Sequence, residues 1–215
     1  MRITVFGAAG NAGSRVVTEA LARGHEVTAV VRDPARFTEL HPEATHRTGD
    51  AENPDQVAEL SAGQDVVVNA TRPAPGRERE HPAITRSLLS GLARTDDVRL
   101  IVIGGAGSLT VPGTEGRLAI DDPRYVPAAW RHIAEASNAQ YAALHTADTR
   151  VAWTYLSPSA HFEPGARTGE FRLGKDELLV AADGTSSISM EDLAVALLDE
   201  AESPNHHRAR FTVGY

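Results

Sequence analysis

The chain contains no cysteine and only one lysine, Lys175, among its 215 residues. Without thiols, it has no disulfide framework, no cysteine nucleophile and no cysteine-ligated zinc or iron–sulfur cluster. With a single lysine, any mechanism that pairs lysine with another side chain can be checked by inspection. The composition therefore excludes several kinds of chemistry before any motif is considered.

Positive charge and long apolar runs are also scarce. The 21 Lys and Arg residues face 29 Asp and Glu residues, for a net charge of −8, which argues against a nucleic-acid partner. The longest apolar runs, such as residues 66–68 and 100–103, are far below the roughly 20 residues that span a bilayer. No membrane partner is expected. The N-terminus runs straight into a glycine cluster, which leaves no room for a signal peptide, so we expect a cytoplasmic protein.

Short β-branched runs alternate with segments of helical periodicity. This alternation predicts an α/β fold with a doubly wound, mainly parallel sheet covered by helices on both faces. The expected strands are residues 3–6, 26–31, 65–69, 100–103 and 151–156. The expected helices are residues 14–23, 34–40, 54–60, 84–94, 128–146 and 191–200.

After residue 150 the pattern is broken by prolines and glycines. We expect one domain over residues 1–215, with residues 157–190 forming a small C-terminal cap over the substrate. Short strands are expected there at residues 170–173 and 178–180, and a last strand at residues 208–215. If that last strand or a helix is left unpaired, it could mediate a homodimer. The Pro- and Arg-rich loop of residues 72–80 is the best candidate for a mobile flap.

A glycine cluster between the first expected strand and helix is the strongest local signal. Its Gly-x-x-Gly-x-x-Gly spacing comprises Gly7, Ala8, Ala9, Gly10, Asn11, Ala12 and Gly13. Glycine lets the backbone turn sharply and approach a pyrophosphate, while the free N–H groups of the next helix attract anions. In this context the spacing predicts a dinucleotide-binding loop. The alternative is a tight structural turn.

The end of the second expected strand carries the residues that distinguish NADP from NAD. An acidic side chain there holds the adenosine ribose of NAD, whereas an arginine accepts the extra phosphate of NADP. Arg32 follows the last apolar residue of the strand, and its guanidinium suits bidentate phosphate contact. Asp33, the next residue, keeps NAD open. The sequence therefore favours NADP, the alternative being an Arg32–Asp33 pair on a solvated helix start.

Several stretches together resemble a known family: residues 7–13, 31–34, 49–51 and 103–109, with residues 153–158 and 164–169 extending the match. They resemble the atypical short-chain dehydrogenase/reductases of the NmrA-like superfamily. The nearest subgroup comprises single-domain NAD(P)H-binding proteins related to biliverdin reductase B, often called NADH-flavin reductases. The resemblance covers nearly the whole chain and implies a Rossmann-type fold and a nicotinamide cofactor, without specifying a substrate.

The resemblance also implies a set of cofactor contacts. Asp50 would accept a hydrogen bond from the adenine amine, unless it is only a cap or turn residue. The other implied contacts are Ala51 at the adenine, Asn69, Ala70 and Thr71 alongside the cofactor, Gly104 and Gly105 under the nicotinamide ribose, and Pro158 beside the nicotinamide ring.

The usual acid of the wider short-chain family is missing. In that family a Tyr-x-x-x-Lys pair protonates a carbonyl, because the lysine lowers the pKa of the tyrosine. Phe171 stands four residues before Lys175, and no tyrosine has a lysine at the required spacing. Tyr141 and His145 have the same spacing, but we interpret them as packing residues on one helix face.

Two functions are compatible with a cofactor site that lacks this pair. The first is reduction of a small conjugated acceptor, FMN or another flavin, or a quinone, which needs positioning more than a strong protein acid. Its candidate catalytic residues are Ser108 as a donor, Tyr125 in an aromatic wall with Trp130, and His161 in the cap. The respective alternatives are a loop-capping serine, a hydrophobic staple at a helix start and a surface histidine. The second is a non-catalytic NADP(H) sensor of the NmrA-like type. No metal-ligand spacing is present, so no metal is expected.

Overall fold

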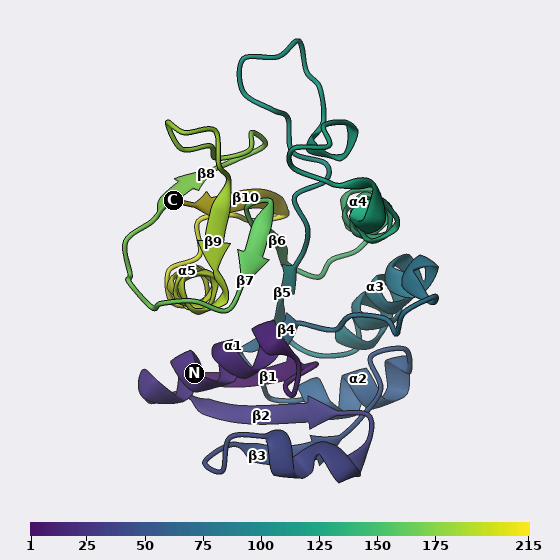
Figure 1. The fold of residues 1–215 in the computed structure, drawn as a ribbon. Helices are drawn as coiled ribbons and strands as arrows, with labels where there is room; N and C mark the ends of the chain where they lie inside the picture. Colours follow the sequence, from purple (N-terminus) through teal and green to yellow (C-terminus); the bar gives the residue numbers. More distant parts are fainter.

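Eight strands form one sheet in the order β3-β2-β1-β4-β5-β6-β10-β8 in the computed structural model, which describes residues 1–215 (Figure 1). Every neighbouring pair is parallel except β10 and β8, which are antiparallel. The strands are β1 (Arg2–Phe6), β2 (Glu26–Val31), β3 (Thr45–Thr48), β4 (Val66–Asn69), β5 (Arg99–Ile103), β6 (Trp153–Ser157), β8 (Arg172–Gly174) and β10 (Ala209–Gly214). The predicted α/β class and mainly parallel sheet are confirmed.

Five α-helices cover the two faces of this sheet (Figure 1). Helices α1 (Asn11–Ala22) and α5 (Met190–Glu202) pack together on one face. Helices α2 (Pro54–Ser61), α3 (His81–Leu92) and α4 (Arg131–His145) pack in series on the other. No helix is long and apolar enough to cross a membrane.

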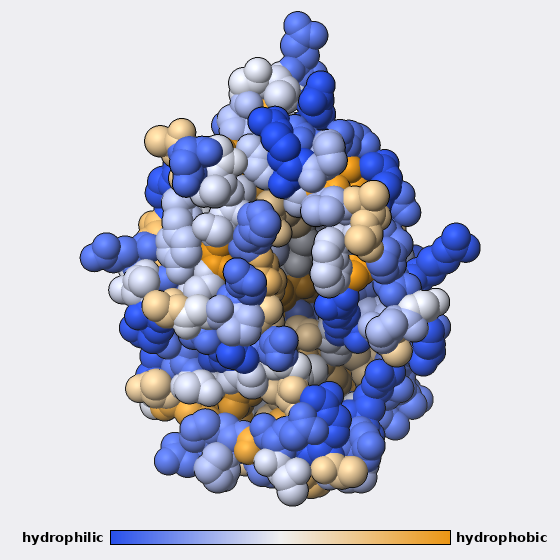
Figure 2. Space-filling model, in the orientation of Figure 1, coloured by the Kyte–Doolittle hydropathy of each residue, from blue (hydrophilic) through white to orange (hydrophobic).

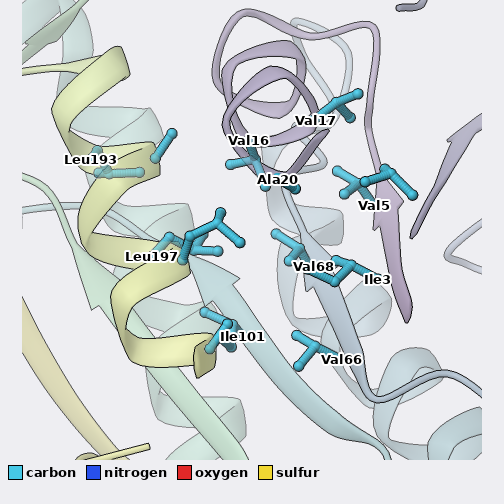
Figure 3. Packing of buried hydrophobic residues seen from close by; sticks show 14 of the residues in the cluster. Ile3, Val5, Val16, Val17, Ala20, Val66, Val68, Ile101, Leu193 and Leu197 are labelled. Carbon is cyan, nitrogen blue, oxygen red and sulfur yellow. The ribbon is translucent and has the colours of Figure 1, made fainter. Parts of the chain in front are cut away.

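Side chains along the central strands alternate between two hydrophobic cores, one on each face of the sheet. Ile3 and Val5 of β1 join α1 and α5 in a cluster of 24 buried residues, in which Leu193 and Leu197 face the sheet (Figure 3). Phe6 points the other way, into a cluster of 17 buried residues under α2, α3 and α4. A strand with both faces buried is apolar at nearly every position, which is why these strands could be read from the sequence.

The segment after β6 is fastened to the start of α5. Strands β7 (His161–Glu163) and β9 (Ser187–Ser189) form a separate parallel pair. The loop between β7 and β8 is held by Asp192, whose carboxylate accepts hydrogen bonds from the backbone N–H groups of Thr168 and Gly169, each at 2.8 Å. Ser189 caps α5 by accepting from the N–H of Asp192 at 2.9 Å.

One expected strand was wrong. Residues 178–180 form no strand, because Leu178 packs into a small apolar cluster under the β5–α4 loop and its N–H pairs with the carbonyl of Thr110. The helical segment expected at residues 34–40 is present as a 3₁₀ helix, η1 (Pro34–Glu39). The expected last strand is confirmed as β10, and it has no unpaired edge because it lies between β6 and β8.

Candidate functional site

A cleft of about 650 Å³ opens at the carboxyl edge of the sheet, where the strand order reverses between β1 and β4. Small-molecule sites in open α/β sheets lie at this position and have volumes of this order. Figure 2 shows that face of the molecule, hollowed near its centre, with apolar surface inside and hydrophilic side chains around it. The cleft is lined by residues that follow β1, β2, β3, β4 and β5, and by residues of α3, α4, α5 and β7.

The glycine cluster forms the tight connection between β1 and α1. Gly7 has a φ of +82°, and a Cβ on it would lie 2.6 Å from the carbonyl oxygen of Ala70. A Cβ on Gly13 would lie only 2.2 Å from the carbonyl oxygen of Gly7. Both positions therefore require glycine for backbone geometry and close packing, and the loop that results lies against the cleft.

Helix α1 presents an open N-terminus to the same cleft. Its N-cap, Gly10, has no side chain to accept a hydrogen bond, and the backbone N–H groups of Asn11, Ala12 and Gly13 donate to no protein group. By contrast, α2 and α5 have side-chain caps. Free N–H groups at the positive end of a helix are suited to a phosphate group, so this loop is compatible with a dinucleotide.

The outer end of the cleft carries charged residues from the ends of β2 and β3. Arg32, Asp33, Arg36, Asp50 and Glu52 all line it. Asp33 accepts a hydrogen bond from the N–H of Ala35 at 2.9 Å and so caps η1. Arg32 is exposed, and its nearest carboxylate, Glu52, is 3.8 Å away.

Residues after β3 and β4 border this end. Asp50 and Ala51 line the cleft, and Asp50 also accepts a hydrogen bond from the N–H of Glu52 at 3.0 Å, as a turn residue would. Ala70 and Thr71 line it as well. Asn69 lies behind them, buried, and accepts hydrogen bonds from the backbone and hydroxyl of Thr71 at 3.1 and 2.6 Å.

The inner end is formed by Gly104 at the end of β5 and by a buried tyrosine. Tyr155 of β6 accepts a hydrogen bond from the N–H of Gly105 at 3.2 Å and donates one to the carbonyl of Ser137 at 3.0 Å. A Cβ on Gly104 would collide with the Tyr155 ring at 2.0 Å. Burial raises the pKa of Tyr155, so its hydroxyl stays protonated and links the Gly104–Gly105 backbone to α4.

Apolar side chains complete the inner end. Ile103, Ile133, Phe162 and Met190 come from four different elements and line the cleft. They leave a largely apolar surface beside Gly104, which suits a flat ring more than a charged group.

The three candidate catalytic residues lie outside this cleft lining. Ser108 accepts a hydrogen bond from Arg210 at 2.7 Å. Tyr125 is buried in a small core under the β5–α4 loop, with Leu109 and Leu178. His161 is exposed on β7, where strand alternation turns the neighbouring Phe162 toward the cleft instead. Five implied cofactor residues are not part of the lining: Asn69, described above, and Ala8, Gly13, Gly105 and Pro158.

Tyr141 and His145, which have the spacing of a Tyr–Lys pair, pack against neighbouring side chains. The Tyr141 ring lies 5.0 Å from that of Tyr155 and 5.8 Å from that of His145, and the Arg210 guanidinium stacks over it at 4.5 Å. Lys175 is exposed in the loop after β8.

Sequence reasoning missed several residues of the cleft. These are Arg36, Glu52, Arg72, Pro73, His81, Ile84, Ile133, Ser137 and Met190. His81 could have been predicted from the sequence. The following Pro82 is typical of a first helical turn, and the first turn of α3 begins at the carboxyl edge of the sheet. The others come from loops and helix faces that carry no local motif.

Comparison with known proteins identifies the family. Residues 7–204 match the model of a family described as NAD(P)H-binding. The chain belongs to this NAD(P)H-binding family. The match begins at Gly7, the first glycine of the loop that opens on the cleft.

Three relatives cover nearly all of this NAD(P)H-binding protein. The uncharacterized protein YwnB of Bacillus subtilis (strain 168) is 40% identical over 99% of this chain and 98% of its own. A candidate epimerase from Bacteroides thetaiotaomicron is 36% identical, with a TM-score of 0.89 over 100% of this chain and 96% of its own. A candidate NADH-flavin reductase from Streptococcus pneumoniae TIGR4 is 30% identical, with a TM-score of 0.84 over 100% and 99%. The NAD(P)H-binding family and the similarity to a candidate NADH-flavin reductase support an oxidoreductase.

Proposed function

We propose that this protein transfers a hydride from NAD(P)H to a small conjugated acceptor, a flavin or a quinone, without a Tyr–Lys pair. The observation that carries the proposal is the composition of the cleft: an open helix N-terminus at one wall, an apolar inner end, and no lysine in the lining. The similarity to a candidate NADH-flavin reductase supports the same reaction class.

Each part of the cleft has a proposed role in binding the cofactor or the acceptor. The free N–H groups of Asn11, Ala12 and Gly13 would bind the pyrophosphate, and Asp50 and Ala51 would flank the adenine. When bound, the reduced nicotinamide supplies a hydride. Phe162 and Met190 would exclude water from the reacting rings and hold the acceptor flat. Because a conjugated ring spreads the incoming charge over its own heteroatoms, the protein needs no strong acid.

NADP(H) is the proposed form of the cofactor. Arg32 is exposed at the cleft and 3.8 Å from its nearest carboxylate, whereas Asp33 is engaged in capping η1. The guanidinium is thus available for the extra phosphate, and one oxygen of the acid that would hold a free ribose is already bonded to the backbone.

Replacing Arg32 with alanine is expected to weaken NADPH binding by roughly 10- to 100-fold, the value of one charge-assisted hydrogen bond. NADH binding should change little, because NADH has no phosphate at that position. Dissociation constants of both cofactors from fluorescence titration would measure the difference. Arg47→Ala, which removes an exposed arginine paired with Glu59 on α2, is the control. Equal losses for NADPH and NADH would refute the assignment.

The reaction itself is tested by following NADPH absorbance with FMN, riboflavin and menadione as separate acceptors. We expect turnover with at least one of them, dependent on the protein. Tight NADPH binding without turnover on any acceptor would contradict the proposal and favour an NADP(H) sensor.

A further inference from the structure

His81 is a buried histidine in the wall of the cleft. It is the first residue of α3 and only 6% exposed, and it lines the cleft together with Arg72, Pro73 and, one helical turn further on, Ile84. The candidate residues predicted from the sequence do not include it, and it is not among the implied cofactor contacts.

Its imidazole has no partner in the protein. The Nδ1 atom is shut off from solvent and makes no hydrogen bond, and no protein group bonds to Nε2. Other histidines with a low exposure are paired: His25 with Glu202 at 2.7 Å, His46 with the carbonyl of His41 at 2.9 Å, and His206 with Glu200 at 2.7 Å. Because Nδ1 is shut off from solvent, Nε2 is the ring nitrogen through which a ligand in the cleft would pair with this buried imidazole.

The surroundings keep this imidazole uncharged. Burial, and then the positive charge of Arg72, lower the pKa of His81 to about 4, against a smaller opposing effect of Glu78. These are the two charged side chains that act on it, and both lie in the loop before α3. The positive end of α3 acts in the same direction as Arg72. At neutral pH the ring is therefore a neutral hydrogen-bonding group rather than a proton-donating cation.

We propose that His81 is a catalytic residue that donates a hydrogen bond from its neutral imidazole to a carbonyl oxygen of the bound acceptor. This inference rests on the proposed function and narrows the substrate class to conjugated rings that carry a carbonyl. Quinones and the flavin isoalloxazine share that chemistry. A neutral imidazole whose pKa is held down at a helix N-terminus is a known means of polarising a carbonyl.

The step balances without any proton leaving His81. Two electrons and one proton reach the acceptor as a hydride, NADPH becomes NADP⁺, and the negative charge that arrives with the hydride is delocalised onto the carbonyl oxygen. In a quinone that oxygen then takes one proton from water, which gives the hydroquinone. In a flavin the charge is shared between the carbonyl oxygen and ring nitrogen N1, and N1 takes the proton from water. His81 stabilises the oxygen while it is charged, as an oxyanion-hole donor does.

Two substitutions separate this role from a structural one. His81→Leu removes the donor, whereas His81→Asn keeps a neutral N–H. We expect kcat/KM for menadione to fall roughly 100-fold or more in His81→Leu and to be substantially restored in His81→Asn, while NADPH binding stays unchanged in both. His145→Leu, which removes an exposed histidine of α4, is the control. Equal kcat/KM in wild type and a folded His81→Leu variant would overturn the inference.

A measurement on the wild-type protein avoids any folding defect of the variants. Nitrogen NMR of the imidazole should show His81 neutral from about pH 5.5 to 8, the range in which an ordinary histidine titrates. Adding menadione to the NADP⁺-loaded protein should shift one ring nitrogen, and the kcat/KM profile should have no histidine inflection in that range. A charged His81 at neutral pH, or no shift with menadione, would contradict the proposal.

The proposed function and the role of His81 can be tested separately. If none of the acceptors supports NADPH oxidation by the wild-type protein, the proposed function is wrong, and so is the role of His81. If the wild type turns over and its His81 ring does not respond to menadione, only the role of His81 is wrong.

Discussion

Replacing Gly13 with alanine is expected to weaken NADPH binding by roughly 100-fold or more, since it misplaces more than one N–H group that would bond to a charged phosphate. The new Cβ would lie 2.2 Å from the carbonyl oxygen of Gly7, which is backbone and cannot rotate away. The β1–α1 loop must therefore shift. That shift would move the free N–H groups of Asn11 and Ala12 away from the position proposed for the pyrophosphate.

A matched control distinguishes loss of the site from loss of stability. Gly24 lies at the other end of α1 with a φ of +78° and nothing within 4 Å of an added Cβ. Gly24→Ala should cost about 1 kcal/mol through backbone strain alone and leave the affinity for NADPH intact. Calorimetric titration of both variants measures the contrast. If Gly13→Ala binds NADPH like wild type, the glycine loop is only a structural turn.

The second large effect concerns a buried ion pair far from the cleft. Arg99 at the start of β5 and Glu200 of α5 are both buried and in direct contact. Glu200 also accepts hydrogen bonds from the backbone N–H of His206 at 3.0 Å and its Nδ1 at 2.7 Å. We expect Glu200→Leu to lose about 3–5 kcal/mol of unfolding free energy, because the Arg99 charge stays buried without its carboxylate, keeping only the Thr154 hydroxyl and a backbone carbonyl as partners.

This loss corresponds to a fall in Tm of roughly 6–20 °C for a chain of this size. The double variant Arg99→Met with Glu200→Leu should recover most of it, because no unpaired charge is left. Thermal melts of the wild type and the three variants give the coupling energy. A double variant as unstable as Glu200→Leu would show that the loss comes from packing and not from the charge.

The same pair makes stability depend on pH. Burial raises the pKa of Glu200, but the hydrogen bonds from His206 and Arg99 outweigh it, so the net pKa lies below its ordinary value. An acid with a lowered pKa stabilises the fold above its unfolded pKa of about 4.3, and this contribution is lost as pH falls through the folded value. The Tm of wild type should therefore fall more steeply in acid than that of the double variant.

The sequence was most informative where one local rule decides the structure. The spacing of Gly7, Gly10 and Gly13 between a strand and a helix leads directly to the loop that opens on the cleft. Strands β1, β2, β4 and β5 are apolar at nearly every position because helices cover both faces. Their alternation with helical segments therefore predicted the α/β fold class.

The sequence was least informative where side chains from distant segments meet. Ser108 follows β5, but its hydroxyl is bonded to Arg210 of β10, a contact across 102 positions of sequence. Tyr125 looks like a wall for a planar ligand, yet it is covered by Leu109 and Leu178. Strands of three residues, such as β7 and β9, carry too little pattern to be recognised. The burial of His81 likewise depends on tertiary packing.

A crystal structure of the protein with NADPH and an oxidised acceptor analogue tests the central claim most directly. The account predicts the pyrophosphate within hydrogen-bonding distance of the N–H groups of Asn11, Ala12 and Gly13. It places the nicotinamide at the apolar inner end beside Gly104, and the acceptor carbonyl at the imidazole of His81. A dinucleotide bound outside this cleft, or an acceptor that cannot reach the nicotinamide within it, would contradict the account.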